Sequence, residues 1–201
     1  KKEKIDINKK DRLITFVGKL NSAKGYDLFG KAIIKILDKY PNWNSVVIGD
    51  EPREKIFFKH KNLKILGFQK HPKVLEIFKK TSIAVACSRW EEPFGRTSLE
   101  ASSRGCAVII SNRGGLPETI TNGIIVRNLN VKNIYNSINK LISNKKLRYQ
   151  LQKLSYKNFY LTDLYVTKKI DYYRNLLAKK YLRKTVTNKS YEKLKVLHVT
   201  N

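Results

Sequence analysis

Two glutamates flank a Pro-Phe-Gly turn in a chain where acidic residues are scarce. Glu92 and Glu100 lie in the stretch EEPFGRTSLE (91–100), and Asp and Glu together number 16 against 42 Lys and Arg. Gly95 has no Cβ, so a ligand can approach the backbone closely at the start of the helix that follows. An ionised carboxylate only accepts hydrogen bonds, which suits the hydroxyls of a vicinal diol. The pattern favours a sugar site, while helix capping by Glu92 and an ion pair at Glu100 are the structural alternatives.

Two lysines lie in the turn after the first apolar run. In FVGKLNSAKG (16–25), Gly18 ends the run, and Lys19 and Lys24 are five positions apart. Both ammonium groups could converge on one dianionic group such as a diphosphate, together with the N–H groups of the next helix. A solvated turn explains these residues equally well. A further turn, NRGGLPETITNG (112–123), could close over a bound nucleotide or sugar, or be a plain turn.

Apolar runs alternate with helical patterns along the chain. Near-continuous apolar strands indicate a parallel sheet buried on both faces, and the alternation predicts an α/β, Rossmann-like, doubly wound fold. In such sheets ligands bind beyond the carboxyl ends of the strands, so the turns described above should share one edge. The expected strands are 13–18, 45–50, 63–68, 83–88, 107–111 and 123–128. The expected helices are 26–40, 71–81, 96–104 and, with interruptions near Asn144 and Tyr160, 131–184.

The composition points to anionic partners. The formal charge is +26, which favours nucleotide phosphates, nucleic acid or an acidic membrane surface. The basic residues spread along the whole chain without a stacking-aromatic signature, which argues against nucleic acid. Cys87 and Cys106 lack metal-ligand spacing and are expected to be buried, reduced thiols of a cytoplasmic protein. No apolar run reaches the roughly 20 residues that span a bilayer. The sequence begins without Met, so we expect a piece of a longer protein.

Read in order, FVGKLNSAKG, VVIGD, LGF, EEPFGRTSLEA, GGLPETI and NG resemble the retaining glycosyltransferases of family 4. The resemblance covers residues 12–178 and implies the second, donor-binding half of a GT-B fold. It implies a hexose-type transfer from a nucleotide diphosphosugar with retention, in bacterial surface-polysaccharide or lipopolysaccharide synthesis. It further implies that neither a metal nor another cofactor is needed. The acceptor, a glycan or a lipid-linked sugar, would bind an N-terminal domain outside this sequence, and the isolated piece would be inactive.

The resemblance also implies a role for each matching residue. Lys19 and Lys24 would contact the donor diphosphate, Glu92 the hydroxyls of the transferred sugar, and Glu100 the ribose diol. Glu92, Lys19 and Lys24 are thereby the expected catalytic residues. The remaining expected binding residues are Gly18, the base-contacting Gly67 and Phe68, and the backbone of Phe94, Gly95, Arg96 and Thr97. Lys19 replaces a common arginine, and Glu51-Pro52 replaces a common Gly-Pro.

Three other readings of the sequence stay open. A nucleotide-sugar epimerase of GT-B type would share the fold, a basic nucleic-acid-binding module would share the charge, and a regulatory domain would keep the fold without the chemistry. We expect one domain over residues 1–184, with a linker and the first strand of a following module in 185–201. The basic helical stretch 164–184 is either a contact with an anionic membrane, such as the inner face of the cell membrane, or a solvated face.

Overall fold

The computed structural model describes residues 5–185. By contacts between Cα atoms, the chain divides after Phe159 into two compact units. The first unit contains the sheet and carries every candidate residue of the expected sugar and diphosphate site. The second contains one long helix and is described separately below.

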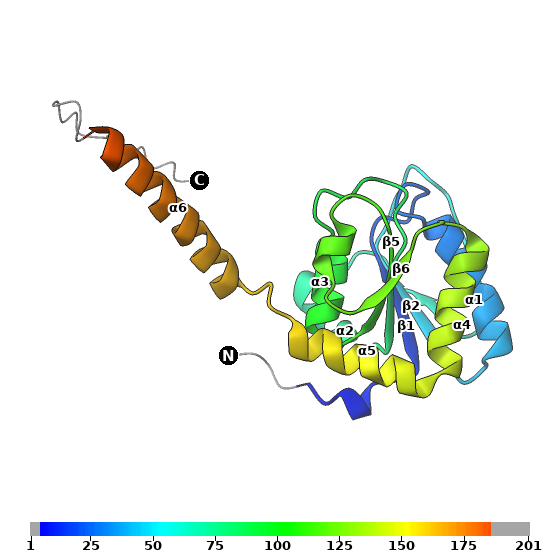
Figure 1. The fold of residues 1–201 in the computed structure, drawn as a ribbon. Helices are drawn as coiled ribbons and strands as arrows, with labels where there is room; N and C mark the ends of the chain where they lie inside the picture. Colours follow the sequence, from blue (N-terminus) through cyan, green and yellow to red (C-terminus); the bar gives the residue numbers. More distant parts are fainter. Residues whose placement is uncertain (1–4, 186–201) are drawn as a thin grey trace. The chain divides into compact units, whose positions relative to one another are not determined.

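Six parallel strands form the centre of the first unit (Figure 1). Their order across the sheet is β3-β2-β1-β4-β5-β6, so the connection reverses direction between β1 and β4. The strands are β1 Leu13–Val17, β2 Asn44–Ile48, β3 Leu63–Ile65, β4 Ile83–Ala86, β5 Ala107–Ser111 and β6 Gly123–Val126. This arrangement confirms the predicted doubly wound, Rossmann-like sheet. Ligand sites in such folds lie at the reversal point, which here is between β1 and β4.

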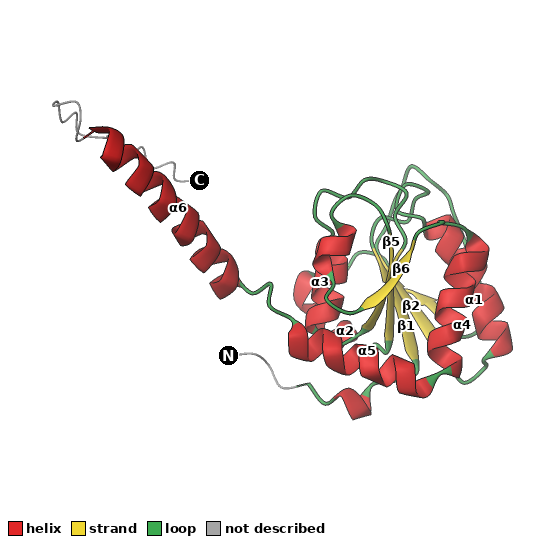
Figure 2. Cartoon of the chain, in the orientation of Figure 1, coloured by secondary structure: helices red, strands yellow, loops and turns green. Residues whose placement is uncertain are grey.

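Helices cover both faces of the sheet (Figure 2). On one face α1 packs against α4, and on the other α2 packs against α3, while α5 contacts α3, α4 and β5. Two short 3-10 helices, η1 and η2, complete the unit. The bounds are η1 Ile7–Lys9, α1 Tyr26–Lys39, α2 His71–Lys80, α3 Arg96–Ser103, η2 Leu116–Thr119, α4 Val131–Ser143 and α5 Lys145–Asn158.

The side chains of β5 pack into two hydrophobic cores, one on each face of the sheet. Ala107 and Ile109 belong to the cluster that includes α1 and α4, whereas Val108 and Ile110 belong to the cluster that includes α2 and α3. All four are fully buried. Successive side chains of a strand point to opposite faces, so a strand covered on both sides must be apolar throughout. This is the physical reason for the near-continuous apolar runs in the sequence.

The strands end earlier than predicted because glycines turn the chain at the ligand edge. The expected strand 63–68 ends at Ile65, and Gly67 two residues later has a φ of 64°. The expected strand 45–50 ends at Ile48, directly before Gly49, whose φ is 136°. Only glycine adopts such angles without strain. These turns release the backbone from the sheet just where a ligand is expected.

The second unit contains the helix α6, Asp163–Thr185. Its apolar and basic side chains alternate around the helix, and the side chains described for it, up to Tyr181, are exposed. The break near Tyr160 that separates it from α5 is confirmed. Across residues 5–185, no helix combines the length and the apolar character that crossing a bilayer requires. The expected strand within 185–201 lies outside the described residues.

Candidate functional site

Lys24 and Glu92 meet at the carboxyl edge of the sheet. Lys24 lies in the loop after β1, and Glu92 lies in the loop between β4 and α3. The Lys24 Nζ donates a hydrogen bond to the Glu92 Oε1 and forms an ion pair with it. The two side chains are only 31% and 13% exposed. Each charge is partly removed from water, so each requires a partner of opposite sign, and the two loops supply one to the other.

A small cavity of about 70 Å³ opens beside this ion pair. Besides Lys24 and Glu92, its lining includes Gly18 from the end of β1 and the start of α3, Gly95, Arg96 and Thr97. Gly95 is the N-cap of α3, has a φ of 86°, and makes no side-chain hydrogen bond to cap the helix. The N–H groups of the first turn therefore point out of the helix without a capping side chain, as anion sites at helix starts require.

A larger cavity of about 380 Å³ adjoins the first. The linings of the two cavities share Val17, Gly18, Arg96 and Thr97, so together they form one continuous edge of the fold. Lys19 and Glu100 line the larger cavity, together with Ile48, Gly49, Asp50, Phe68, Gln69 and His71. Its size and its mixture of apolar and charged groups are typical of a small-molecule site.

Glu100 is held by two cationic or polar neighbours. Its Oε1 lies 3.0 Å from the Nε of Arg96 and 2.9 Å from the Nε2 of His71. Arg96 is one helical turn away on α3, whereas His71 is the first residue of α2. The side chain of Glu100 is 15% exposed, so both contacts help to keep its carboxylate in one orientation at the cavity wall. The ion pair that the sequence offered as the structural alternative for Glu100 is thus present, and the side chain still lines the cavity.

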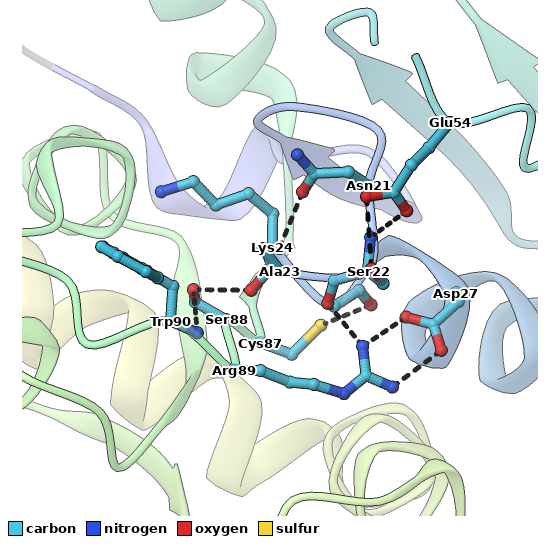
Figure 3. A network of polar contacts seen from close by, with 11 residues as sticks. Asn21, Ser22, Ala23, Lys24, Asp27, Glu54, Cys87, Ser88, Arg89 and Trp90 are labelled. Carbon is cyan, nitrogen blue, oxygen red and sulfur yellow. Dashed lines mark hydrogen bonds and ion pairs between the residues drawn. The ribbon is translucent and has the colours of Figure 1, made fainter.

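The loop that carries Lys24 is built by close contacts (Figure 3). The Lys24 backbone N–H donates to the Asn21 Oδ1 at 2.9 Å, and the Asn21 Nδ2 donates to the Glu51 Oε2 at 3.2 Å. Glu51 therefore steadies the loop, although it stands where glycine is common among the transferases that the sequence resembles. Gly25 has a φ of 72°, and a Cβ placed on it would lie 2.0 Å from the carbonyl oxygen of Cys87. Only glycine allows this loop to approach Cys87, directly after β4, so closely.

The glycine turn after β5 supports the backbone of Glu92. The N–H of Gly115 donates to the carbonyl of Glu92 at 2.7 Å, and a Cβ on Gly114 would lie 2.3 Å from the same oxygen. The carboxylate of Glu91 also accepts a hydrogen bond from the Gly114 N–H. Of the residues that follow, Leu116 lines the smaller cavity. In this structure the turn packs behind Glu92. The sequence suggested either a loop that closes over a ligand or a plain turn, and neither interpretation described this contact.

The structure brings most of the predicted residues to one edge. Those that line the two cavities are Gly18, Lys19, Lys24, Phe68, Glu92, Gly95, Arg96, Thr97 and Glu100. Gly67 and Phe94 belong to the same loops, but their side chains or Cα atoms line neither cavity. The sequence interpretation missed Asp50, Gln69 and His71. The available signal was their position, because Asp50 follows β2, Gln69 follows β3 and His71 begins the next helix, and the carboxyl ends of parallel strands share one edge.

The two cysteines take no part in this chemistry. Both are free and buried, as the sequence predicted. Burial raises the pKa of the Cys87 thiol to about 12, and it also raises the pKa of the Cys106 thiol. At neutral pH neither forms the thiolate that a nucleophile or metal ligand needs. Within residues 5–185, moreover, no three His, Cys, Asp or Glu side chains gather in a way that could hold a metal ion.

Comparison with known proteins places these features in context. Residues 1–158 match the family model described as glycosyl transferases group 1. The spore coat protein SA of Bacillus subtilis is 29% identical over 161 residues, which cover 72% of this chain and 43% of that protein. The lipopolysaccharide core biosynthesis mannosyltransferase LpsB of Rhizobium meliloti is 26% identical over 132 residues, covering 61% of this chain and 37% of that protein. The chain thus spans less than half the length of these curated relatives.

Solved structures share the fold. The C-terminal domain of a glycosyl transferase group 1 family protein, LpcC, from Francisella tularensis is 32% identical, with a TM-score of 0.66, over 72% of this chain and 82% of that one. The Anabaena protein Alr3699/HepE, solved with UDP-glucose, has a TM-score of 0.65 over 84% of this chain and 49% of that one. At 19% identity, the second likeness concerns the fold alone.

Proposed function

Because the chain belongs to the glycosyl transferases group 1 family, we propose that it is the donor-binding part of a retaining glycosyltransferase. The reaction moves a hexose-type sugar from a nucleotide diphosphosugar to an acceptor hydroxyl. The observation that carries this proposal is the Lys24–Glu92 ion pair at the cavity edge that also holds Lys19 and Glu100. Cations for a diphosphate and carboxylates for hydroxyls are adjacent there.

The proposed mechanism follows from where charge develops. When the bond between the anomeric carbon and the diphosphate breaks, negative charge grows on the leaving diphosphate. Lys24 and Lys19 stabilise this charge, and the N–H groups at the start of α3 add to it. Lysine suits this role because its ammonium is a compact charge with three rotatable donors. In this proposal the cationic side chains make a metal ion unnecessary.

The two glutamates bind different parts of the donor. Glu92, beside Lys24, accepts hydrogen bonds from hydroxyls of the transferred sugar, and Glu100, in the larger cavity, accepts them from the ribose diol. The larger cavity takes the nucleoside, with Phe68 beside the base. The Anabaena structure with UDP-glucose supports a nucleotide sugar as the donor of this fold.

The rest of the enzyme supplies the acceptor side. The relatives are more than twice as long as the stretch that this chain matches, so we propose that the acceptor, a glycan or lipid-linked sugar, binds a further domain. Without that domain the chain binds its donor but transfers no sugar. The relative from Rhizobium meliloti supports bacterial lipopolysaccharide or surface-polysaccharide synthesis. The buried free thiols support a cytoplasmic reaction, with the basic stretch 164–184 as a peripheral contact to the membrane.

Calorimetric titration of the chain tests the proposal. We expect one-to-one binding of one of the uridine, guanosine and adenosine diphosphates, and weaker binding of the matching monophosphate. Equal affinity for the diphosphate and the monophosphate would overturn the assignment of the lysines. Absence of binding by a folded chain would overturn the assignment of the whole site. Sugar transfer by the chain alone would contradict the need for a further domain.

A further inference from the structure

Arg89 ties the loop that carries Lys24 to the loop that carries Glu92. It lies between β4 and Glu92, and its side chain crosses to the start of α1 (Figure 3). The guanidinium binds Asp27 in a bidentate manner, with Nη1 2.6 Å from Oδ1 and Nη2 2.7 Å from Oδ2. Its Nη1 also donates to the carbonyl of Ser22, which lies in the Lys24 loop. One side chain thus binds both ends of the short segment that contains Lys24.

The backbone around Arg89 adds to this connection. The carbonyl of Ala23 accepts three hydrogen bonds, from the N–H of Arg89 at 2.8 Å, the N–H of Trp90 at 3.1 Å and the Oγ of Ser88 at 3.1 Å. Ala23 directly precedes Lys24. The chain from Ser88 to Glu92 is therefore attached to the residues on either side of Lys24 before it reaches Glu92.

The other side of the same loop is also held. Glu54 accepts a hydrogen bond from the Ser22 N–H at 2.8 Å, and Asn21 accepts one from the Lys24 N–H at 2.9 Å. Beyond Arg89, the carbonyl of Glu92 accepts from the Gly115 N–H. Arg89 thus adds a charged side-chain link between a loop fixed on one side and a loop fixed on the other. The Arg89 side chain lines neither cavity, so it makes no direct contact with the proposed ligand.

We propose that Arg89 is a positioning residue that sets the distance between the Lys24 ammonium and the Glu92 carboxylate, and so the placement of the donor diphosphate. This inference rests on the proposed function and adds a residue that the sequence interpretation did not assign. The planar guanidinium is required because it binds a carboxylate through two parallel hydrogen bonds and a carbonyl at the same time. A lysine supplies charge without this fixed geometry.

The test compares diphosphate with monophosphate binding in the chain. Arg89→Gln removes the bidentate link, and Arg89→Lys keeps only its charge. Lys9→Gln is the matched control, because it removes the same charge from an exposed pair with Asp6, before the first strand. Each variant is titrated with the uridine, guanosine and adenosine diphosphates and with their monophosphates, and its thermal unfolding is recorded by circular dichroism.

We expect Arg89→Gln to weaken diphosphate binding about tenfold. This is the size of one charge-assisted hydrogen bond, which here would be lost between the misplaced Lys24 ammonium and the diphosphate. Binding of the monophosphate should change less than about twofold, because the second phosphate is the group that Lys24 holds. Arg89→Lys should give an intermediate loss, and the control should equal the wild type. Equal losses for both ligands, or equal effects of Arg89→Gln and the control, would overturn the inference.

Amide hydrogen exchange without ligand separates this inference from the proposed function. In the wild type the N–H groups of Gly25 and Tyr26 are bonded to the carbonyls of Ser22 and Asn21, and should exchange slowly. In Arg89→Gln they should exchange faster, while the amides of β5 keep their protection. Unchanged exchange at residues 25 and 26 would overturn the positioning role even if the diphosphate binds. Failure of the wild type to bind any diphosphate would instead overturn the proposed function.

Discussion

At the scale of single residues, glycines allow two stretches of backbone to come close together, and this determines where the charged side chains of the site lie. Gly25 is needed both because its φ is 72° and because Cys87, directly after β4, leaves no space for a Cβ. Gly67 also has a positive φ, 64°, but a Cβ there would meet nothing within 4 Å. The two glycines share a conformation and differ in their surroundings. Substituting each with alanine therefore separates conformational strain from steric clash.

We expect Gly67→Ala to cost about 1 kcal/mol in the free energy of unfolding, which is the penalty of the left-handed conformation. Gly25→Ala should cost at least about 3 kcal/mol, because the Cβ forces the loop away from Cys87 in addition to that strain. Urea unfolding followed by circular dichroism measures both values. Equal costs for the two variants would show that the loop and Cys87 are not in close contact.

The Asp27–Arg89 pair makes stability depend on pH in a known direction. The hydrogen bonds from Arg89 lower the pKa of the Asp27 carboxyl from its ordinary value of 3.8. Since the folded-state pKa is depressed, the stabilisation is present above pH 3.8 and is lost as the pH falls through the folded-state pKa. The Arg89 side chain is 40% exposed, so solvent screens part of the attraction.

Asp27→Asn should therefore reduce the free energy of unfolding by about 1 kcal/mol at pH 7. The difference between variant and wild type should shrink as the solution is made more acidic than pH 3.8. Asp171→Asn, at an exposed pair 3.8 Å from Arg174, is the matched control and should have no effect at either pH. A difference for Asp27→Asn that is independent of pH would contradict the electrostatic explanation.

At the scale of secondary structure, a lysine before the first strand closes the end of α2. The Nζ of Lys10 donates to the carbonyls of Phe78, Lys79 and Thr81 at 3.0, 3.1 and 2.8 Å. The last carbonyls of a helix have no partner within the helix, so a cation there satisfies them and interacts favourably with the helix dipole. Burial lowers the pKa of the Lys10 ammonium, although the three carbonyls hydrogen-bond it.

Lys10→Ala should destabilise the fold by about 2 kcal/mol, since three partly buried carbonyls lose their common donor. Its neighbour Lys9, whose side chain is 85% exposed, is the control, and Lys9→Ala should change the stability by less than about 0.5 kcal/mol. Thermal unfolding of the two variants side by side gives both values. A similar, small change in both would show that Lys10 does not cap α2.

The sequence predicted the elements well because burial on two faces leaves a strong apolar signal. Within residues 5–185 every expected strand and helix is present, and the errors lie at the ends, as with the predicted strand 63–68 that ends at Ile65. Lys24 and Glu92 were predicted as one site because both follow strands at the same edge. The Arg89–Asp27 link was not predicted, since nothing local joins residues that are 62 positions apart. The same holds for Lys10 and α2.

At the scale of the whole molecule, a strongly basic chain places carboxylates beside the cations of its candidate site. The chain carries +26, but at the cavity edge Lys24 is paired with Glu92, and Arg96 with Glu100. The edge therefore offers cations and acceptors together, which a site for phosphate alone would not need. A nucleotide sugar presents both a diphosphate and hydroxyls, and so matches the two kinds of group at once.

The proposed site depends most directly on two separate roles. Lys24 binds the diphosphate, and Glu92 binds hydroxyls of the transferred sugar. The measurement is calorimetric titration of the wild type, Lys24→Ala and Glu92→Gln with the nucleoside diphosphate that the wild type binds and with the corresponding nucleotide sugar. Lys24→Ala should weaken both ligands about tenfold or more. Glu92→Gln should weaken the nucleotide sugar by a similar factor and leave the diphosphate unweakened. If Glu92→Gln affected both ligands alike, or if neither variant changed either affinity, the proposed site would be wrong.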